Sequence, residues 1–477
     1  MSARGADNPT AGAHIAHRRF CFAATLAVLL GVTPSLAAPL ALVGGTLIDG
    51  TGAPPVADAT VVIDGDRIVA AGPGGSIAIP ADAERFDARG KWVLPGFIDA
   101  HVHFFQSGGL YARPDILDLR TLRSYGEEIA AVRAAIPATL ARTLAAGIPG
   151  VVDFGGPLWT FDVRALAETL PYAPRVAASG PLLATRFPPA LAADDPPMIE
   201  VHTPAEGRAA VRSLLPRHPD LIKIWFIQAR PNIEPQMEWV RAVIAEAHEA
   251  GIAVAVHATE LHVARAVVEA GADVLVHGVD DAVADAAFQF QLKAQGVVYT
   301  PTFAVNENYS RVLGLSFRPT ALETRLGDPT QVRSLLSLAE LQAAGRLRGV
   351  RPTPVPPLDP ESAANVRRLQ ALGVVIAAGS DAGNIGTLPG AGFHRELELL
   401  VAAGLSTMEA LVAATKGSAA AMRRKDVGTV EVGKRADLVL LDADPLADIR
   451  NSSRVFRVVK AGIVLDPEAI LRSAELR

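Results

Sequence analysis

The chain has 477 residues, with 45 basic and 50 acidic side chains and a formal net charge of −5. Half of the residues are hydrophobic, so the chain can bury a sizeable core. Glycine and proline are plentiful but scattered, which excludes a collagen-like or low-complexity chain. No basic stripe with interleaved aromatic residues occurs, and this argues against a nucleic acid as partner.

The first 37 residues are typical of a secretory signal peptide. Arg18 and Arg19 precede an apolar run from Phe20 to Val32 that is too short to span a membrane comfortably, and small residues follow at 35–37. We therefore expect cleavage near residue 37 and a periplasmic or secreted mature protein without stable membrane insertion. The only cysteine, Cys21, lies in this run, so the mature chain would form no disulfide.

Short runs of β-branched residues separated by tight turns occur in residues 38–91 and again in 426–477. This pattern is typical of strands and hairpins. Neither segment alone can bury one face of a sheet. We predict that the two segments pair into one small β-sandwich, with residues 92–425 inserted between them.

Residues 92–425 alternate apolar runs with helical patterns, which predicts an α/β fold with the strands in a parallel barrel. The predicted strands include Gly150–Asp153, Arg175–Ala178, Leu221–Trp225, Ala253–His257, Val274–His277 and Val374–Asp381. The predicted helices include Gln236–Ala250, Leu261–Ala270 and Glu396–Ala403, each closed by a glycine. The segment Arg318–Asp359, rich in proline, glycine and charge, is expected to be a long excursion between late strands.

Chemistry-bearing side chains gather at the predicted strand ends, where barrel enzymes place their active sites. His101 and His103 are alternate residues at the end of an apolar strand, so both imidazoles face the same side and suit a transition metal. The alternative is an incidental surface pair. His257, His277 and Asp381 end three later runs.

Lys223 lies inside an apolar run, where a lone charged amine would be costly. One reading pairs it with an acid or brings its amine to water. The other is a neutral amine that reacts with CO2 to form a carbamate. The residues alone leave both readings open.

The run Val93–His103 resembles the strand-1 signature of the amidohydrolase superfamily. Further motifs match in order along the chain: Ile222–Ile224, Val256–Ala258, Val276–Gly278, Gly379–Asp381 and Gly433–Val439. The details are most similar to the branch of imidazolonepropionase-like and prolidase-like proteins. The resemblance implies a distorted (β/α)8 barrel with a bipartite β-sandwich, and hydrolysis of an amide C–N bond.

The resemblance also implies two divalent metal ions, with zinc as first choice. His101, His103 and Asp381 would hold the more buried ion. His257 and His277 would hold the second ion, and N6-carboxylated Lys223 would bridge the two. A metal-bridging hydroxide would attack the carbonyl of the substrate, with Asp381 as general base and then general acid.

The substrate is expected to be a small-molecule amide or peptide-like compound, linear or cyclic. Alternatives are an ester, lactone or phosphoester, or a catalytically silent binding protein. An oligomer is compatible with the sequence.

Three residues are candidates for the substrate side: Tyr299, His394 and Arg186. Their alternative roles are packing for Tyr299, structural bonding for His394 and solvation for Arg186. Val152 stands where family members often have an arginine. The run 183–189 lacks the histidine that prolidase-like members often carry, and this departure argues against dipeptidase activity.

Overall fold

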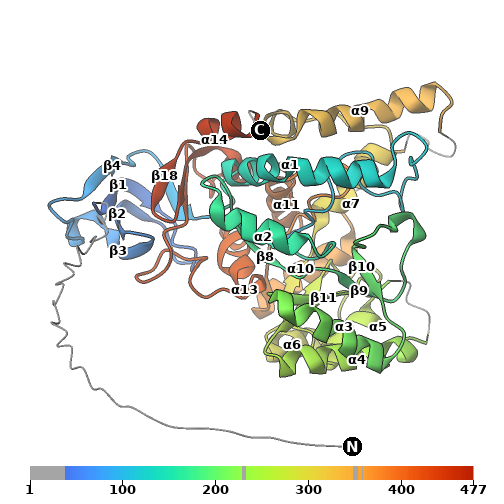
Figure 1. The fold of residues 1–477 in the computed structure, drawn as a ribbon. Helices are drawn as coiled ribbons and strands as arrows, with labels where there is room; N and C mark the ends of the chain where they lie inside the picture. The colour runs from blue at the N-terminus through green and yellow to red at the C-terminus, as the bar shows by residue number, and fades with distance from the viewer. Residues whose placement is uncertain (1–37, 228–231, 348–352, 357, 476–477) are drawn as a thin grey trace, which may run out of the picture. The chain divides into compact units, whose positions relative to one another are not determined.

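Three β-sheets and the helices around them make up the described part of the chain (Figure 1). The computed structural model describes residues 38–227, 232–347, 353–356 and 358–475, which belong to one compact unit, 38–477. The predicted signal peptide, 1–37, lies outside the described residues. No helix within the described ranges is both long and apolar enough to cross a membrane.

The first sheet joins strands from both ends of the chain. Its strands are β1 (Leu40–Leu47), β2 (Val56–Asp64), β3 (Arg67–Pro73), β4 (Glu84–Asp87), β5 (Trp92–Pro95), β16 (Leu438–Leu441), β17 (Val455–Lys460) and β18 (Ile463–Leu465). They lie in the order β18-β17-β16-β5-β1-β2-β3, with β4 beside β1. β16 pairs antiparallel with β5, so the two chain ends meet there. The sandwich form stays a prediction.

The other two sheets consist of parallel strands. β6 (Ile98–Val102), β7 (Gly150–Asp153) and β8 (Arg175–Ala178) form one sheet. The other has the order β10-β9-β11-β12-β13-β14-β15. Its strands are β9 (Leu182–Ala184), β10 (Met198–Glu200), β11 (Leu221–Trp225), β12 (Ala253–His257), β13 (Val274–Val276), β14 (Val298–Thr300) and β15 (Val375–Ile376). This arrangement confirms the α/β class.

Backbone hydrogen bonds connect the two parallel sheets at both borders. Ala100 donates to Ala378 and Asp381 donates to His101, which ties β6 to the segment after β15. Asp220 donates to Ala178, which ties the start of β11 to β8. The carboxyl ends of these strands are therefore held close to one another, while the closed barrel stays a prediction.

Helices follow most of the parallel strands. They are α1 (Tyr125–Ala145), α2 (Thr160–Thr169), α3 (Pro204–Leu214), α4 (Glu234–Glu249), α5 (Leu261–Glu269), α6 (Ala286–Gln295), α7 (Phe303–Leu313), α8 (Ala321–Leu326), α9 (Pro329–Ala343), α10 (Pro360–Leu372), α11 (Ala391–Ala402), α12 (Thr407–Val412), α13 (Ser418–Ala421) and α14 (Pro467–Glu475). The predicted glycine stops are confirmed after α4 and α5, where Gly251 and Gly271 have positive φ values of 74° and 104°.

Alternate residues of the parallel strands pack into one buried cluster. Its members are small or aliphatic apart from Phe154, and they include Ile98, Ala100, Val152, Ala177, Ala253, Ala255, Val274, Val276 and Val298. The intervening residues of the same strands pack outward against the helices in a second cluster. Because both faces are buried, each strand is held firmly, and the polar side chains at its carboxyl end are fixed in place.

Candidate metal centre

Six polar side chains from five chain segments meet at the carboxyl ends of the parallel strands. His101 lies in β6 and Lys223 in β11, and His257 ends β12. His103 and His277 follow directly after β6 and β13, and Asp381 lies in the segment after β15. All six line one cavity of about 770 Å³: His101, His103, Lys223, His257, His277 and Asp381.

The distances among these side chains are short. The Nε2 atoms of His101 and His103 lie 3.2 Å apart. Asp381 Oδ1 lies 3.4 Å from His101 Nε2 and 3.2 Å from His103 Nε2. The His277 ring centroid lies 5.0 Å from that of His101 and 4.4 Å from that of His257. One ligand atom each from His101, His277 and Asp381 fall within 4.8 Å of one another, close enough to share a metal ion.

Burial favours the neutral form of His101, His257 and His277. Desolvation, assisted by the nearby Lys223 amine, lowers the pKa of His257 to about 3 and holds the pKa of His101 and His277 well below the usual range for imidazole. A neutral imidazole carries the lone pair that a metal requires. Asp381 Oδ1 is buried and has no hydrogen-bond partner among the described residues. The donor set therefore fits a divalent metal ion.

Lys223 is the only amine in this cluster of six side chains. It is 2% exposed, and its Nζ atom has no hydrogen-bond partner in the described part of the chain. Nζ lies 5.1 Å from the centre of the Phe154 ring. Burial lowers the pKa of Lys223 to about 7, with the charge of Asp381 opposing the shift. The sequence left open whether Lys223 pairs with an acid or reacts as a neutral amine. Within the described residues, Lys223 forms no hydrogen bond to an acid.

Two histidine rings are oriented by partners that sequence reasoning missed. His103 Nδ1 lies 2.8 Å from the carbonyl oxygen of Gly155, to which it donates. His277 Nδ1 lies 2.6 Å from the hydroxyl of Thr302. In both rings the bond at Nδ1 leaves Nε2 as the nitrogen that could ligate a metal ion.

A buried carboxyl group ties β6 to the segment that carries Asp381. Asp99 accepts hydrogen bonds from the backbone N–H and the hydroxyl of Ser380, at 2.9 and 2.5 Å. Burial raises the pKa of Asp99 to about 7. Asp381 itself has a φ of +56°, a strained conformation for a non-glycine residue. The hydrogen bonds from Ser380 to Asp99 hold the backbone next to Asp381 in place.

The cavity wall beyond the cluster combines apolar side chains with polar ones, among them Asp280, Glu307, Asp359 and a partly buried arginine, Arg113. The apolar lining includes Phe105, Leu182, Met198, Trp225 and Phe303. Arg113 forms two hydrogen bonds to Asp115, at 2.8 and 2.6 Å, and donates to Asn384 Oδ1 at 2.6 Å. The charge of this guanidinium is therefore already compensated within the protein. No pattern in the sequence singles out Arg113.

The three predicted substrate residues do not line this cavity. The hydroxyl of Tyr299 accepts a hydrogen bond from the backbone of Val279 at 2.7 Å, within the core. His394 is buried between the hydroxyl of Ser452 and the carbonyl oxygen of Ala146, each 3.0 Å from a ring nitrogen. Arg186 is exposed in the loop after β9. For Tyr299 and His394 the structure shows packing and structural bonding, the alternatives weighed from the sequence.

Residues 92–464 match the amidohydrolase family. The chain belongs to this family. As an amidohydrolase it is a metal-dependent hydrolase of amide C–N bonds, which confirms the function predicted from the sequence. An imidazolonepropionase from Streptomyces griseus is 27% identical over 414 residues, covering 83% of this chain and 89% of the relative.

Prolidase-like proteins are among the solved structures with a similar fold. A putative prolidase from Bifidobacterium longum has a TM-score of 0.66 and 26% identity, covering 92% of this amidohydrolase and 100% of that chain. A Xaa-Pro dipeptidase with bound methionine has a TM-score of 0.68 and 24% identity, covering 90% and 100%. The similarity to the imidazolonepropionase-like and prolidase-like branch is confirmed.

Proposed function

We propose that the cluster holds two divalent metal ions, with zinc as first choice. His101, His103 and Asp381 would ligate one ion, and His257 and His277 the other. The proposal rests on one observation: four imidazoles converge on one cavity with a carboxylate oxygen, Asp381 Oδ1, that has no hydrogen-bond partner among the described residues. Imidazole and carboxylate ligands suit zinc, which is redox-inert.

Lys223 completes the ligand set once its amine is carboxylated. An amine this deeply buried without a hydrogen-bond partner among the described residues is costly unless it is chemically altered or paired. A carbamate adds two oxygen ligands and a negative charge, enough to bridge two cations. The apolar neighbour Phe154 shields the carbamate from water.

The protein side of the mechanism centres on Asp381. The metal ions that these residues would hold would polarise the scissile carbonyl and would lower the pKa of a water to about 7. Asp381 Oδ1, free of hydrogen bonds to other described residues, accepts the proton of that water and delivers it to the leaving nitrogen. His103 and His277 keep their orientation through Gly155 and Thr302, so the acceptor oxygen and the cavity hold their geometry during turnover.

The substrate in this proposal is a small amide or peptide-like compound with an apolar part. The apolar wall around Trp225 and Met198 supports the apolar part. The names of the relatives, imidazolonepropionase and Xaa-Pro dipeptidase, support the small amide.

A screen of dipeptides, N-acyl amino acids and cyclic amides beside matched esters and lactones tests this assignment. The purified protein should hydrolyse amides, and the Asp381→Asn variant should not. Turnover of esters or lactones alone would contradict the proposal.

The remaining sequence predictions form part of the same proposal. The parallel strands would close as a (β/α)8 barrel over 92–425, and 38–91 with 426–477 would form the bipartite sandwich. Residues 1–37 would be removed on export to the periplasm or beyond. N-terminal sequencing of the protein from a periplasmic extract tests export: a start near residue 38 is expected, and an intact Met1 in the cytosolic fraction alone would contradict it.

A further inference from the structure

Thr302 occupies the N-cap position of α7 but does not cap the helix. Its φ and ψ are 53° and 54°, in the left-handed region, and its side chain makes no hydrogen bond to the first turn. The usual arrangement is an extended N-cap residue whose side-chain oxygen accepts from the first-turn backbone. Six α-helices in the described part of the chain show it, at Ser124, Thr203, Asp285, Thr320, Asp328 and Ser406.

The Thr302 hydroxyl instead contacts a predicted metal ligand. Its Oγ1 lies 2.6 Å from Nδ1 of His277. His277 also has a positive φ, of 74°, so two strained residues face one another across this bond. Strain at two non-glycine residues persists only when the surroundings enforce it.

A carboxyl group from another helix takes over the capping of α7. Glu396, on α11, is fully buried, and its Oε2 accepts a hydrogen bond from the backbone N–H of Ala304 at 2.7 Å. Because this oxygen satisfies a first-turn donor, the Thr302 hydroxyl is left free for His277. The unusual N-cap therefore has a structural cause in α11.

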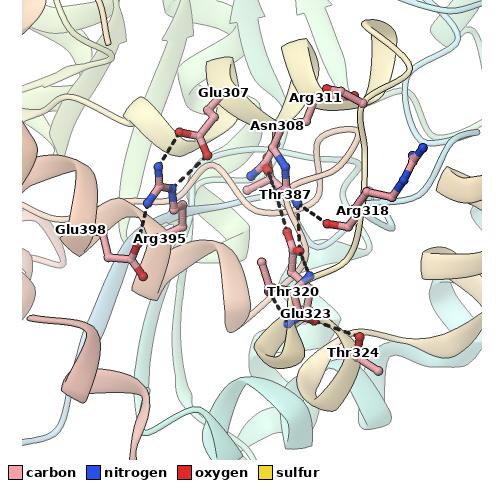
Figure 2. Close-up of polar contacts among 11 residues, drawn as sticks. Glu307, Asn308, Arg311, Arg318, Thr320, Glu323, Thr324, Thr387, Arg395 and Glu398 are labelled. Atoms are coloured by element: carbon pink, nitrogen blue, oxygen red, sulfur yellow. Dashed lines mark hydrogen bonds and ion pairs between the residues drawn. The ribbon is translucent and has the colours of Figure 1, made fainter. Parts of the chain in front are cut away.

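Further bonds fix α7 against α11. Figure 2 shows Arg395, the neighbour of Glu396, forming two bonds to Glu307 of α7, at 2.9 and 2.8 Å. Asn308 of α7 donates to the hydroxyl of Thr387, which lies in the segment just before α11, at 3.4 Å. Thr302 thus stands at the end of a helix whose position is fixed along its length.

We propose that Thr302 is a positioning residue that orients His277 for its metal ion, and that Glu396 holds Thr302 in that role. With Nδ1–H donating to Oγ1, the lone pair of the His277 ring lies on Nε2, which faces the cluster. Loss of such a partner typically weakens metal binding ten- to a hundredfold. This inference rests on the metal centre proposed above.

Zinc binding to the apoprotein, measured by competition with a chromogenic chelator, tests the role of Thr302. Thr302→Val removes the hydroxyl and keeps the branched shape, whereas Thr302→Ser keeps the hydroxyl. Thr300→Val is the matched control, because the Thr300 hydroxyl is buried without a hydrogen-bond partner among the described residues. We expect Thr302→Val to raise the dissociation constant of at least one zinc equivalent tenfold or more, and the other two variants to bind as the wild type does.

Unchanged zinc affinity in Thr302→Val would overturn the inference, even if the melting temperature of the apoprotein falls, because that result describes a purely structural threonine. A wild-type protein that binds no zinc would instead overturn the metal centre itself, and this inference with it.

Glu396 gives a second test. Glu396→Gln keeps a carbonyl acceptor for Ala304 and should bind zinc normally, whereas Glu396→Leu should weaken binding as Thr302→Val does. Equal zinc affinity of the Glu396→Gln and Glu396→Leu variants would show that Glu396 does not hold Thr302 in position.

Discussion

The exchange of Asp381 for asparagine separates metal binding from proton transfer. Asparagine has the same shape as aspartate and tolerates the left-handed conformation at φ +56°, where alanine would be strained. The backbone carbonyl of Asp381 still accepts from Asn384 Nδ2 at 3.1 Å, and the lost Oδ1 has no hydrogen-bond partner within the described ranges. The variant should therefore fold normally and keep most of its metal.

The expected loss of activity follows from the lost base. General acid–base catalysis contributes about 10² to 10⁴ in rate, which corresponds to about 2.7 to 5.4 kcal/mol at about 1.36 kcal/mol per factor of ten. A neutral amide cannot accept the proton of the attacking water. We thus expect kcat of Asp381→Asn to fall by at least about a hundredfold.

Two measurements check this prediction together. Elemental analysis gives metal per chain, and steady-state kinetics on the best substrate of the amide screen gives kcat. Asp381→Glu, which keeps the carboxylate but lengthens the side chain, is the matched control and should retain more activity than the asparagine variant. Near-wild-type kcat in Asp381→Asn with full metal content would refute the role of Asp381 as base.

Three further predictions concern buried polar groups. Lys223→Ala should lose one metal equivalent and activity, and short carboxylates such as acetate should restore part of both; full metal content in the variant would contradict a bridging carbamate. Burial raises the pKa of Glu396 to about 8, so its contribution to stability is full below about pH 4.5 and is lost as the pH rises through 8. The melting temperature of Glu396→Gln, relative to wild type, should therefore increase from pH 5 to pH 9, and a constant difference would exclude this titration. His394→Leu leaves the Ser452 hydroxyl and the Ala146 carbonyl unpaired. The free energy of unfolding measured in urea should therefore fall by about 1–3 kcal/mol, while the metal content stays the same. A loss of metal in this variant would show that His394 contributes to the metal centre.

The sequence predicts the long, strongly patterned elements well. β7, β8, β11 and β12 have the predicted bounds, because continuous apolar runs indicate buried parallel strands. β9 and β10 escape prediction, since three residues carry no periodicity. The segment Arg318–Asp359 contains α8 and α9, whose helical pattern is masked by proline, glycine and charge at their borders.

The sequence predicts site residues only where a side chain that can ligate a metal lies within or at the end of a predicted strand. The six cluster residues stand out because histidine, lysine or aspartate interrupts or ends an apolar run. Arg113, Asn384 and Thr302 lie in loops or at a helix start, and their contacts join residues far apart in the chain. Conversely, His394 and Tyr299 are polar residues in apolar surroundings whose partners come from tertiary packing, so no local pattern separates them from ligands.

The metal content of the purified wild-type protein tests the central claim most directly. After expression with supplemented zinc and removal of loosely bound ions, elemental analysis should give about two zinc ions per chain. The Lys223→Ala variant, purified in parallel, should hold fewer. A wild-type protein that carries no metal under these conditions would contradict the proposed metal centre and every catalytic role derived from it.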